Sequence, residues 1–313
     1  TLFSEKIQEL KDRIASVIVG QEQTVDLILT AILANGHVLI EGVPGVAKTL
    51  LARLTARLID ADFSRVQFTP DLMPSDVLGT TVFNMKTNGF DFHQGPIFAD
   101  IVLVDEINRA PAKTQAALFE VMEERQISID GTTHRMGDLY TILATQNPVE
   151  QEGTYKLPEA QLDRFLMKIT MDYPSLEEEV NILERHHTNA ALVKLDDIVP
   201  AITKEELLSL RAFMNQVFVD RTLLQYIALI VQQTRTSKAV YLGASPRASV
   251  AMLQSSKAYA LLQGRDFVTP EDIKFVAPYV LQHRLILTAE AEMEGYSPVK
   301  VTQRLIDKVE VPK

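Results

Sequence analysis

Apolar residues recur at two different spacings along the first half of the chain. Between Ser4 and Asn35 they follow the period of an amphipathic helix, interrupted at Val19-Gly20, which predicts two helices. Farther on, short apolar runs alternate with helical stretches. The runs predict strands at 37–41, 64–68, 101–104, 140–145 and 166–171, and the stretches predict helices at 48–58 and 112–124. This alternation is typical of a parallel sheet with helices on both faces, which binds ligands at the carboxyl ends of its strands.

Two segments interrupt the alternation. The segments 80–92 and 126–136 contain Asn88-Gly89 and Asp130-Gly131, which are turn signals of tight β-hairpins. For each segment two interpretations stay open, an ordinary surface hairpin or a loop that grips a ligand or client.

Beyond Pro174 the pattern becomes almost entirely helical. Ser175 with Glu178 and Thr203 with Glu206 have the spacing of helix-capping boxes, and the apolar stripes that follow are typical of core faces. A length of 313 residues also exceeds one typical domain. We therefore predict two units, an α/β unit at 1–173 and a helical unit at 174–313.

Composition narrows the class of protein. Apolar residues make up 46% and charged residues 23%, as in ordinary globular proteins, and the absence of cysteine excludes disulfides and thiolate metal ligands. The chain shows neither the long apolar stretch of a membrane helix nor a signal-like start, so we expect a cytoplasmic protein with no membrane insertion. The net charge of −10 makes nucleic acid an unlikely partner, although local basic patches stay possible.

The first candidate chemistry lies in the sequence GVPGVAKT, which directly follows the predicted strand 37–41. A strand that breaks into a glycine-bearing loop and then a helix aims backbone N–H groups at phosphate oxygens. Lys48 would reach the β and γ phosphates of ATP, and the Thr49 hydroxyl would bind Mg²⁺. The usual motif has glycine before the lysine, but Ala47 fits if its φ is negative. The alternative is a flexible turn. The predicted nucleotide-binding residues are Gly42, Val43, Pro44, Gly45, Val46, Ala47, Lys48, Thr49 and Leu50.

The second candidate is a pair of carboxylates at the end of the strand 101–104. Adjacent acids after a buried strand are costly unless they meet a cation or water. Asp105 would hold Mg²⁺ through water, and Glu106 would act as the base that polarises the attacking water. The alternative is a helix N-cap pair.

Three further polar residues stand at the ends of predicted elements. Asn147 follows the strand predicted at Tyr140 to Ala144 and would position the attacking water, or form an Asx turn before proline. Arg164 and Arg247 are candidate partners for a γ-phosphate, because arginine combines a fixed charge with forked donors. Either arginine could instead form a surface ion pair.

At these residues the chain resembles the MoxR family of AAA+ ATPases. The resemblance rests on QFTPDLMPSDVLGT (67–80), GPIFADIVLVDEINRAPAKTQAALFEVMEERQ (95–126), ATQNPVEQEGTYKLPEAQLDRFLMKI (144–169) and GASPRAS (243–249). It implies a P-loop α/β core with a parallel sheet between helices, followed by an all-helical lid.

The resemblance also implies roles for the candidate residues. Lys48 and Thr49 look like Walker A, Asp105 and Glu106 like Walker B, and Asn147 like sensor 1. Arg164 resembles an arginine finger that acts on a neighbouring subunit, and Arg247 resembles a sensor 2 that contacts ATP between core and lid. Val19 and Gly20 are similar to the stretch that lines the adenine. The segments 80–92 and 126–136 resemble the family's helix-2 insert and pre-sensor hairpin.

By resemblance, the protein is expected to hydrolyse ATP with Mg²⁺ as a homo-oligomeric ring, expected to be a hexamer. It would be a chaperone-like factor in the assembly, activation or metal-cofactor insertion of protein complexes, with a von Willebrand A domain protein as a possible partner. The alternatives are a nucleic-acid motor, a magnesium-chelatase-like subunit and a scaffold that binds ATP without hydrolysing it.

Overall fold

A five-stranded parallel sheet forms the centre of the α/β part of the molecule, in the order β2-β5-β8-β1-β9. The computed structural model describes residues 2–42, 47–147, 154–189 and 194–313. The sheet consists of β1 (Val38–Gly42), β2 (Phe63–Gln67), β5 (Ile101–Asp105), β8 (Thr141–Gln146) and β9 (Met167–Met171). Each strand begins and ends within one residue of its predicted bounds, so the predicted parallel α/β core is confirmed.

Helices cover both faces of this sheet because successive side chains of a strand point to opposite faces. Leu103 of β5 lies in the hydrophobic core beneath α1, α2 and α3, whereas Val102 and Val104 lie in the core beneath α5. These helices are α1 (Leu2–Val17), α2 (Glu22–Leu33), α3 (Lys48–Leu58) and α5 (Ala112–Glu124). All five positions of β5 are buried, as expected for a strand covered on both faces.

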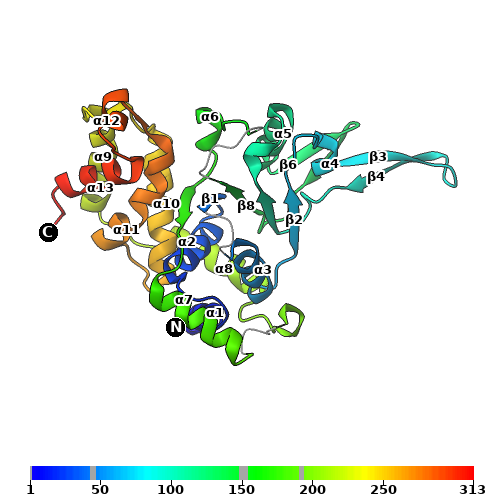
Figure 1. Ribbon diagram of the computed structural model, residues 1–313, viewed down its shortest axis with the longest axis horizontal. Helices are drawn as coiled ribbons and strands as arrows, with labels where there is room; N and C mark the ends of the chain where they lie inside the picture. Colours follow the sequence, from blue (N-terminus) through cyan, green and yellow to red (C-terminus); the bar gives the residue numbers. More distant parts are fainter. Residues whose placement is uncertain (1, 43–46, 148–153, 190–193) are drawn as a thin grey trace.

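Both predicted hairpins are present. One is formed by β3 (Gly79–Asn84) and β4 (Gly89–Gln94), follows the short α4 (Pro74–Leu78), and projects from the core in Figure 1. The other is formed by β6 (Gln126–Ile129) and β7 (Thr132–Arg135). Asn88 and Asp130 adopt left-handed backbone angles with φ of 52° and 51°, which the turn signals require.

The second half of the described chain is mainly helical. It contains α6 (Glu159–Leu162), α7 (Leu176–His187), α8 (Lys204–Phe213), α9 (Arg221–Thr236), α10 (Pro246–Leu262), α11 (Pro270–Leu281), α12 (Ala289–Met293) and α13 (Pro298–Lys308). It also contains the short strands β10 (Val240–Leu242) and β11 (Ile286–Leu287). The remaining short elements are the 3-10 turns η1 (Ile107–Arg109), η2 (Leu195–Asp197), η3 (Met214–Gln216) and η4 (Gln282–Arg284). Ser175 caps α7 through a capping box with Glu178, as predicted.

Hydrogen bonds and a shared hydrophobic core join the helical half to the sheet. His283 of η4 donates from Nε2 to the carbonyl of Phe165 at 2.8 Å, and Arg284 donates to the carbonyl of Leu166 at 3.0 Å. A single hydrophobic core continues from α1 and α2 into α8 to α11. The boundary between 173 and 174 stays a prediction, because α7 and α8 pack on the α/β core. Arg185 of α7, for example, donates to the carbonyl of Ser16 at 2.6 Å.

Among the described residues, no helix combines the length and the apolar character needed to cross a membrane.

Candidate nucleotide-binding site

Three neighbouring strands end at the same edge of the sheet and bring candidate residues together there. Because β8 lies between β5 and β1, Asp105, Asn147 and Gly42 follow one another along this edge. Lys48 begins α3 and donates from Nζ to the carbonyl of Gly42 at 3.2 Å. Burial lowers the pKa of Lys48, whereas the negative charges of Asp105 and Glu106 act to raise it. The described part of the edge therefore combines a half-buried cation with two carboxylates.

The phosphate loop itself is described only at its two ends. Residues 43–46, which include the predicted Val43, Pro44, Gly45 and Val46, lie outside the described residues. Ala47 has φ −76°, so its methyl group causes no backbone strain where the usual motif has glycine. Thr49 and Leu50 lie half-buried in the first turn of α3. Their proposed contacts with metal and phosphate stay predictions.

Asp105 is held on both of its oxygens. The Thr145 hydroxyl donates to Oδ1 at 2.8 Å and accepts the backbone N–H of Glu106 at 3.1 Å. The Arg65 guanidinium donates to Oδ2 from Nε at 2.9 Å and from Nη2 at 2.6 Å. Carboxylate and hydroxyl oxygens at this edge are the ligands that Mg²⁺ prefers, so the residues present fit a magnesium ion.

Glu106 has an unusual backbone conformation. Its φ of 53° places it in the left-handed region, which a side chain of this size rarely occupies. The bond to Thr145 helps to hold it there, and its carboxylate accepts from Arg109 Nη1 at 2.9 Å. Strained backbone of this kind is concentrated at functional sites, which supports a catalytic assignment for Glu106.

Asn147 directly follows a group of polar side chains that links β8, β1 and β9. Gln146 donates from Nε2 to Glu41 Oε1 at 2.7 Å, and Lys168 of β9 pairs with the same carboxylate at 3.1 Å. This group fixes the end of β8 from which Asn147 extends. The Asx turn that Asn147 would form before proline involves Pro148, which lies outside the described residues.

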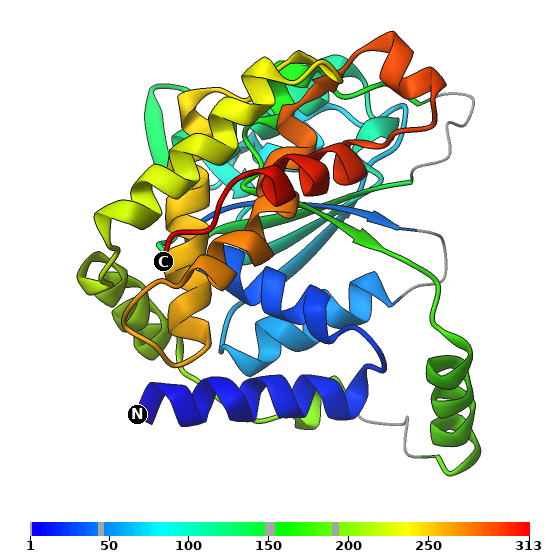
Figure 2. The ribbon, with the colours of Figure 1, turned by 90° about the vertical axis from the view of Figure 1, so that its left-hand side faces the viewer.

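Val19 and Gly20 form the connection between α1 and α2. Gly20 has φ +75°, and a Cβ at this position would lie 2.2 Å from Glu178 Oε2, so both conformation and space favour glycine. Figure 2 shows this connection, the end of β1 and the start of α7 on one side of the molecule. The position suits the predicted contact with adenine, which stays a prediction.

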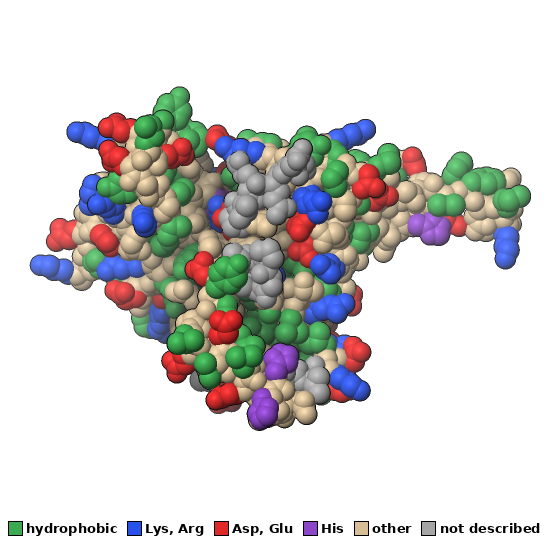
Figure 3. Space-filling view, viewed as in Figure 1, with side chains coloured by type: hydrophobic (Ala, Val, Ile, Leu, Met, Phe, Trp, Pro, Cys, Tyr) green, Lys and Arg blue, Asp and Glu red, His purple; other side chains and the backbone are tan. Residues whose placement is uncertain are grey.

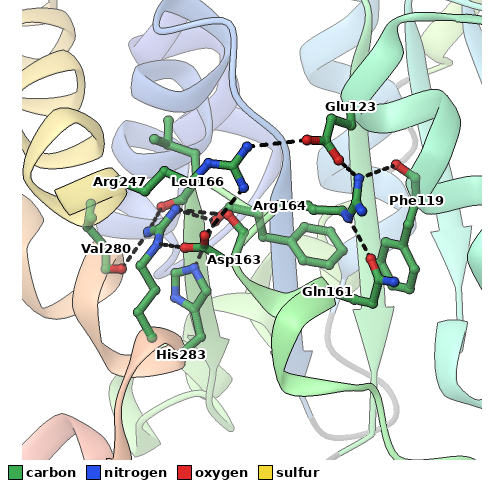
Figure 4. Close-up of polar contacts among 11 residues, drawn as sticks. Phe119, Glu123, Gln161, Asp163, Arg164, Leu166, Arg247, Val280 and His283 are labelled. Atoms are coloured by element: carbon green, nitrogen blue, oxygen red, sulfur yellow. Dashed lines mark hydrogen bonds and ion pairs between the residues drawn. The ribbon is translucent and has the colours of Figure 1, made fainter. Parts of the chain in front are cut away.

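Arg164 and Arg247 lie at the other edge of the sheet. Arg164 lies three residues before β9, and Leu166 donates its N–H to the carbonyl of His37 just before β1. Figure 4 shows Glu123, at the end of α5, between the two arginines. Arg247 pairs with Glu123 at 3.2 Å and with Asp163 at 3.5 Å.

In this structure Arg247 lies away from Lys48, and the predicted contact of Arg247 with the ATP of its own subunit stays a prediction. The five-residue β1 separates the edge with Arg247 from the edge with Gly42, and such a strand is about 13 Å long. The sequence motif around Arg247 could not reveal this, because the position of α10 depends on how the helical half packs. In the structure, Arg247 accompanies Arg164 instead of Lys48.

Several residues of the site were not singled out from the sequence. Arg65 and Thr145 reach Asp105 from neighbouring strands, and only the order of the strands places them there. Asp163 and Arg284 are paired at 2.7 Å, and Arg284 is only 5% exposed. The unusual arginine in the middle of β2 was the one available sequence signal.

Comparison with known proteins agrees with this fold and site. The family model described as "ATPase family associated with various cellular activities (AAA)" matches residues 37–167, and the model of the AAA lid domain matches residues 232–307. The chain is therefore an AAA ATPase by fold and by family.

Individual relatives define the family more closely. The uncharacterized protein YeaC of Bacillus subtilis is 47% identical, over 96% of this chain and 93% of its own length. Chaperone MoxR1 of Mycobacterium tuberculosis is 44% identical, over 95% of this chain and 80% of its own length. The crystal structure of a presumed ATPase from Cytophaga hutchinsonii is 41% identical with a TM-score of 0.91, covering 100% of this chain and 96% of the other. The chain belongs to the MoxR family of AAA+ ATPases.

Proposed function

We propose that the protein binds ATP with Mg²⁺ at the carboxyl edge of the sheet and hydrolyses it to ADP and phosphate. The observation that carries this proposal is the convergence of Lys48, Asp105 and Glu106 at the ends of β1 and β5. Family membership supports nucleotide binding and ATPase activity.

Each residue of this edge has a separate part in the proposed reaction. Lys48 binds the β and γ phosphates, and the Thr49 hydroxyl with Asp105 holds Mg²⁺, which when bound neutralises charge on the phosphates. Glu106 accepts the proton of the attacking water as general base. Asn147, at the end of the adjacent strand, orients that water.

The site is completed by a second copy of the chain. Arg164 and Arg247 lie at the sheet edge away from Lys48, which supports a role for both on the nucleotide of a neighbouring subunit. A contact between two different faces of identical subunits generates a ring when its rotation closes. We propose a ring of this kind with six subunits, in which each site receives its arginines from the next subunit.

The work of the ring is proposed to be chaperone-like. The hairpin β3–β4 carries exposed hydrophobic side chains, with Phe83 48%, Met85 87% and Phe90 73% exposed, and Figure 3 shows such side chains along the projecting hairpin. This surface suits a protein client, and the name of the relative Chaperone MoxR1 points the same way. The proposed role is assembly, activation or metal-cofactor insertion of protein complexes in the cytoplasm, with a von Willebrand A domain protein as partner.

The alternative of a nucleic-acid motor has weaker support. The segment 80–92 contains one lysine and one aspartate, so the projecting hairpin offers no net positive charge to phosphates. A magnesium-chelatase-like subunit would share the same nucleotide chemistry and differ only in its client.

The variant Glu106→Gln tests the proposal, because it removes the base and keeps the shape of the side chain. We expect it to bind ATP with the affinity of the wild type and to hydrolyse it at least 10²-fold more slowly, roughly the contribution of a general base. Lys48→Ala, as the matched control, should lose ATP binding itself. Hydrolysis by Glu106→Gln at the wild-type rate would contradict the catalytic assignment.

The same variant serves to identify the client. Purified from its native cell in ATP, it should retain bound partners that mass spectrometry can name. A von Willebrand A domain protein or a metalloenzyme supports the chaperone role, whereas nucleic acid released by salt favours the motor.

A further inference from the structure

Arg65 occupies the carboxylate that the proposed reaction requires for its metal. Both Nε and Nη2 of Arg65 donate to the same oxygen of Asp105, Oδ2, at 2.9 and 2.6 Å. Arg65 belongs to β2, the outermost strand of the sheet. The register of β2 on β5 places Gln67 beside Asp105. Arg65 therefore reaches forward along β2 to the end of β5.

This contact uses most of the acceptor capacity of Asp105. A carboxylate oxygen has two lone-pair sites, and the two N–H groups of Arg65 occupy those of Oδ2. On Oδ1, one site accepts the Thr145 hydroxyl at 2.8 Å. A guanidinium in contact also neutralises the carboxylate, which makes it a poorer ligand for a second cation.

Lys48 does not occupy this position on Asp105. Lys48 donates to the carbonyl of Gly42, and its burial disfavours the charged form. The Asp105 side chain is 13% exposed, whereas the Arg65 side chain is 48% exposed. Arg65 can leave Asp105 for solvent without burying an unpaired charge, but Asp105 cannot leave its place in the sheet.

We propose that Arg65 competes with the metal for Asp105: it holds Oδ2 in an ion pair and releases this oxygen when the metal and nucleotide bind. The inference rests on the proposed function, because it concerns the same magnesium site. Its consequence is that metal binding is opposed by the cost of breaking the Arg65–Asp105 pair. Removing that pair should make Mg²⁺ strengthen nucleotide binding more than it does in the wild type.

The test compares Arg65→Met, which keeps length and removes charge, with Arg65→Lys, which keeps charge. For each protein, the dissociation constant of a fluorescent ATP analogue is measured in EDTA and in excess Mg²⁺. We define the ratio as the dissociation constant in EDTA divided by that in Mg²⁺, so a larger ratio means that Mg²⁺ strengthens binding more. In Arg65→Met this ratio should rise roughly three- to fivefold, the range expected for a partly exposed ion pair. In Arg65→Lys the ratio should stay within about twofold of the wild type.

This ratio distinguishes competition with the metal from two other roles of Arg65, direct contact with the nucleotide and orientation of Asp105. If Arg65 contacts the nucleotide directly, both constants rise together and the ratio stays unchanged, which overturns the proposal. If Arg65 orients Asp105 for the metal, the ratio falls, which overturns it as well. The same ratio in Arg65→Lys as in Arg65→Met would contradict an account based on charge.

Two controls guard against loss of structure and failure of the parent proposal. Arg57→Met makes the same substitution at an exposed arginine that donates to the carbonyl of Ile198, and it should leave the ratio unchanged. Thermal unfolding of each variant checks the fold. A wild-type ratio of one would contradict the proposed magnesium site itself, whereas a larger wild-type ratio that Arg65→Met does not change overturns only the role of Arg65.

Discussion

His37 shows how one buried side chain joins the sheet to the helix on its face. The ring donates from Nε2 to the carbonyl of Met122 at 2.9 Å, and its Nδ1 accepts the N–H of Ile142 at 3.0 Å. The bond from Ile142 requires the neutral ring, since the charged ring has no acceptor. Burial, together with the nearby charge of Arg125, lowers the pKa of His37 to about 3. The folded protein therefore keeps this ring neutral far below its ordinary pKa.

This lowered pKa predicts a specific loss of stability in acid. Above pH 6.5 the ring is neutral in both folded and unfolded chains; as pH falls from 6.5 toward 3, the unfolded chain takes up a proton that the folded chain refuses. The free energy of unfolding should fall in this window. In His37→Gln the free energy of unfolding should depend less steeply on pH, by up to about 1.4 kcal/mol per pH unit. Urea unfolding between pH 4 and 6.5 measures this dependence.

Residues of the nucleotide site differ in how far the sequence could predict them. Lys48 and Asp105 stand next to the ends of strong strand patterns, so local sequence was enough to bring them to one edge. Arg65 was missed because its contact depends on which strand lies beside β5. The place of Arg247 beside Glu123 and Asp163 results from the packing of α10, which no local pattern encodes.

At the scale of elements, the two hairpins support each other. Their turns were predicted from Asn88-Gly89 and Asp130-Gly131, but their mutual packing was not. The Thr81 hydroxyl donates to Asp130 at 2.7 Å, and the Phe92 ring stacks on His134 at 4.4 Å between ring centroids. Side chains this far apart in sequence meet only once β4 and β7 are placed by the core.

Phe92→Ala should therefore loosen the projecting hairpin without unfolding the core. Phe92 is half-buried between His134 and Phe98, so we expect the opening free energy of β3–β4 to fall by about 1–2 kcal/mol, less than for a fully buried phenylalanine. Amide hydrogen exchange of β3 and β4 measures this change. Met85→Ala, 87% exposed at the turn, should leave exchange unchanged. Equal protection in Phe92→Ala and the wild type would show that the stacking does not hold the hairpin.

At the scale of the whole molecule, the proposed catalytic groups lie at opposite edges of one sheet. Lys48 and Glu106 belong to the carboxyl edge, and Arg164 and Arg247 to the amino edge. The bonds from η4 to the segment leading into β9 fasten the helical half to the amino edge. The arginines and the carboxyl edge of one chain therefore lie too far apart to act on one nucleotide in this arrangement of the two halves, which is why the site is proposed to be shared between subunits.

A mixing experiment tests whether the site is shared between subunits. Glu106→Gln lacks the base but offers Arg164, whereas Arg164→Ala keeps the base but offers no finger. Each should be nearly inactive alone, because a finger supplied in trans contributes roughly 10³ to 10⁵ in rate.

In a random one-to-one mixture, a subunit with an intact base meets a neighbour with an intact arginine at about a quarter of the interfaces. We therefore expect up to a quarter of the wild-type ATPase rate to return on mixing, rising with protein concentration as rings form. The double variant Glu106→Gln/Arg164→Ala should restore nothing to either single variant. If Arg164 instead acts within its own subunit, or only supports the fold through Glu123, mixing the two single variants leaves the activity at the level of the separate proteins.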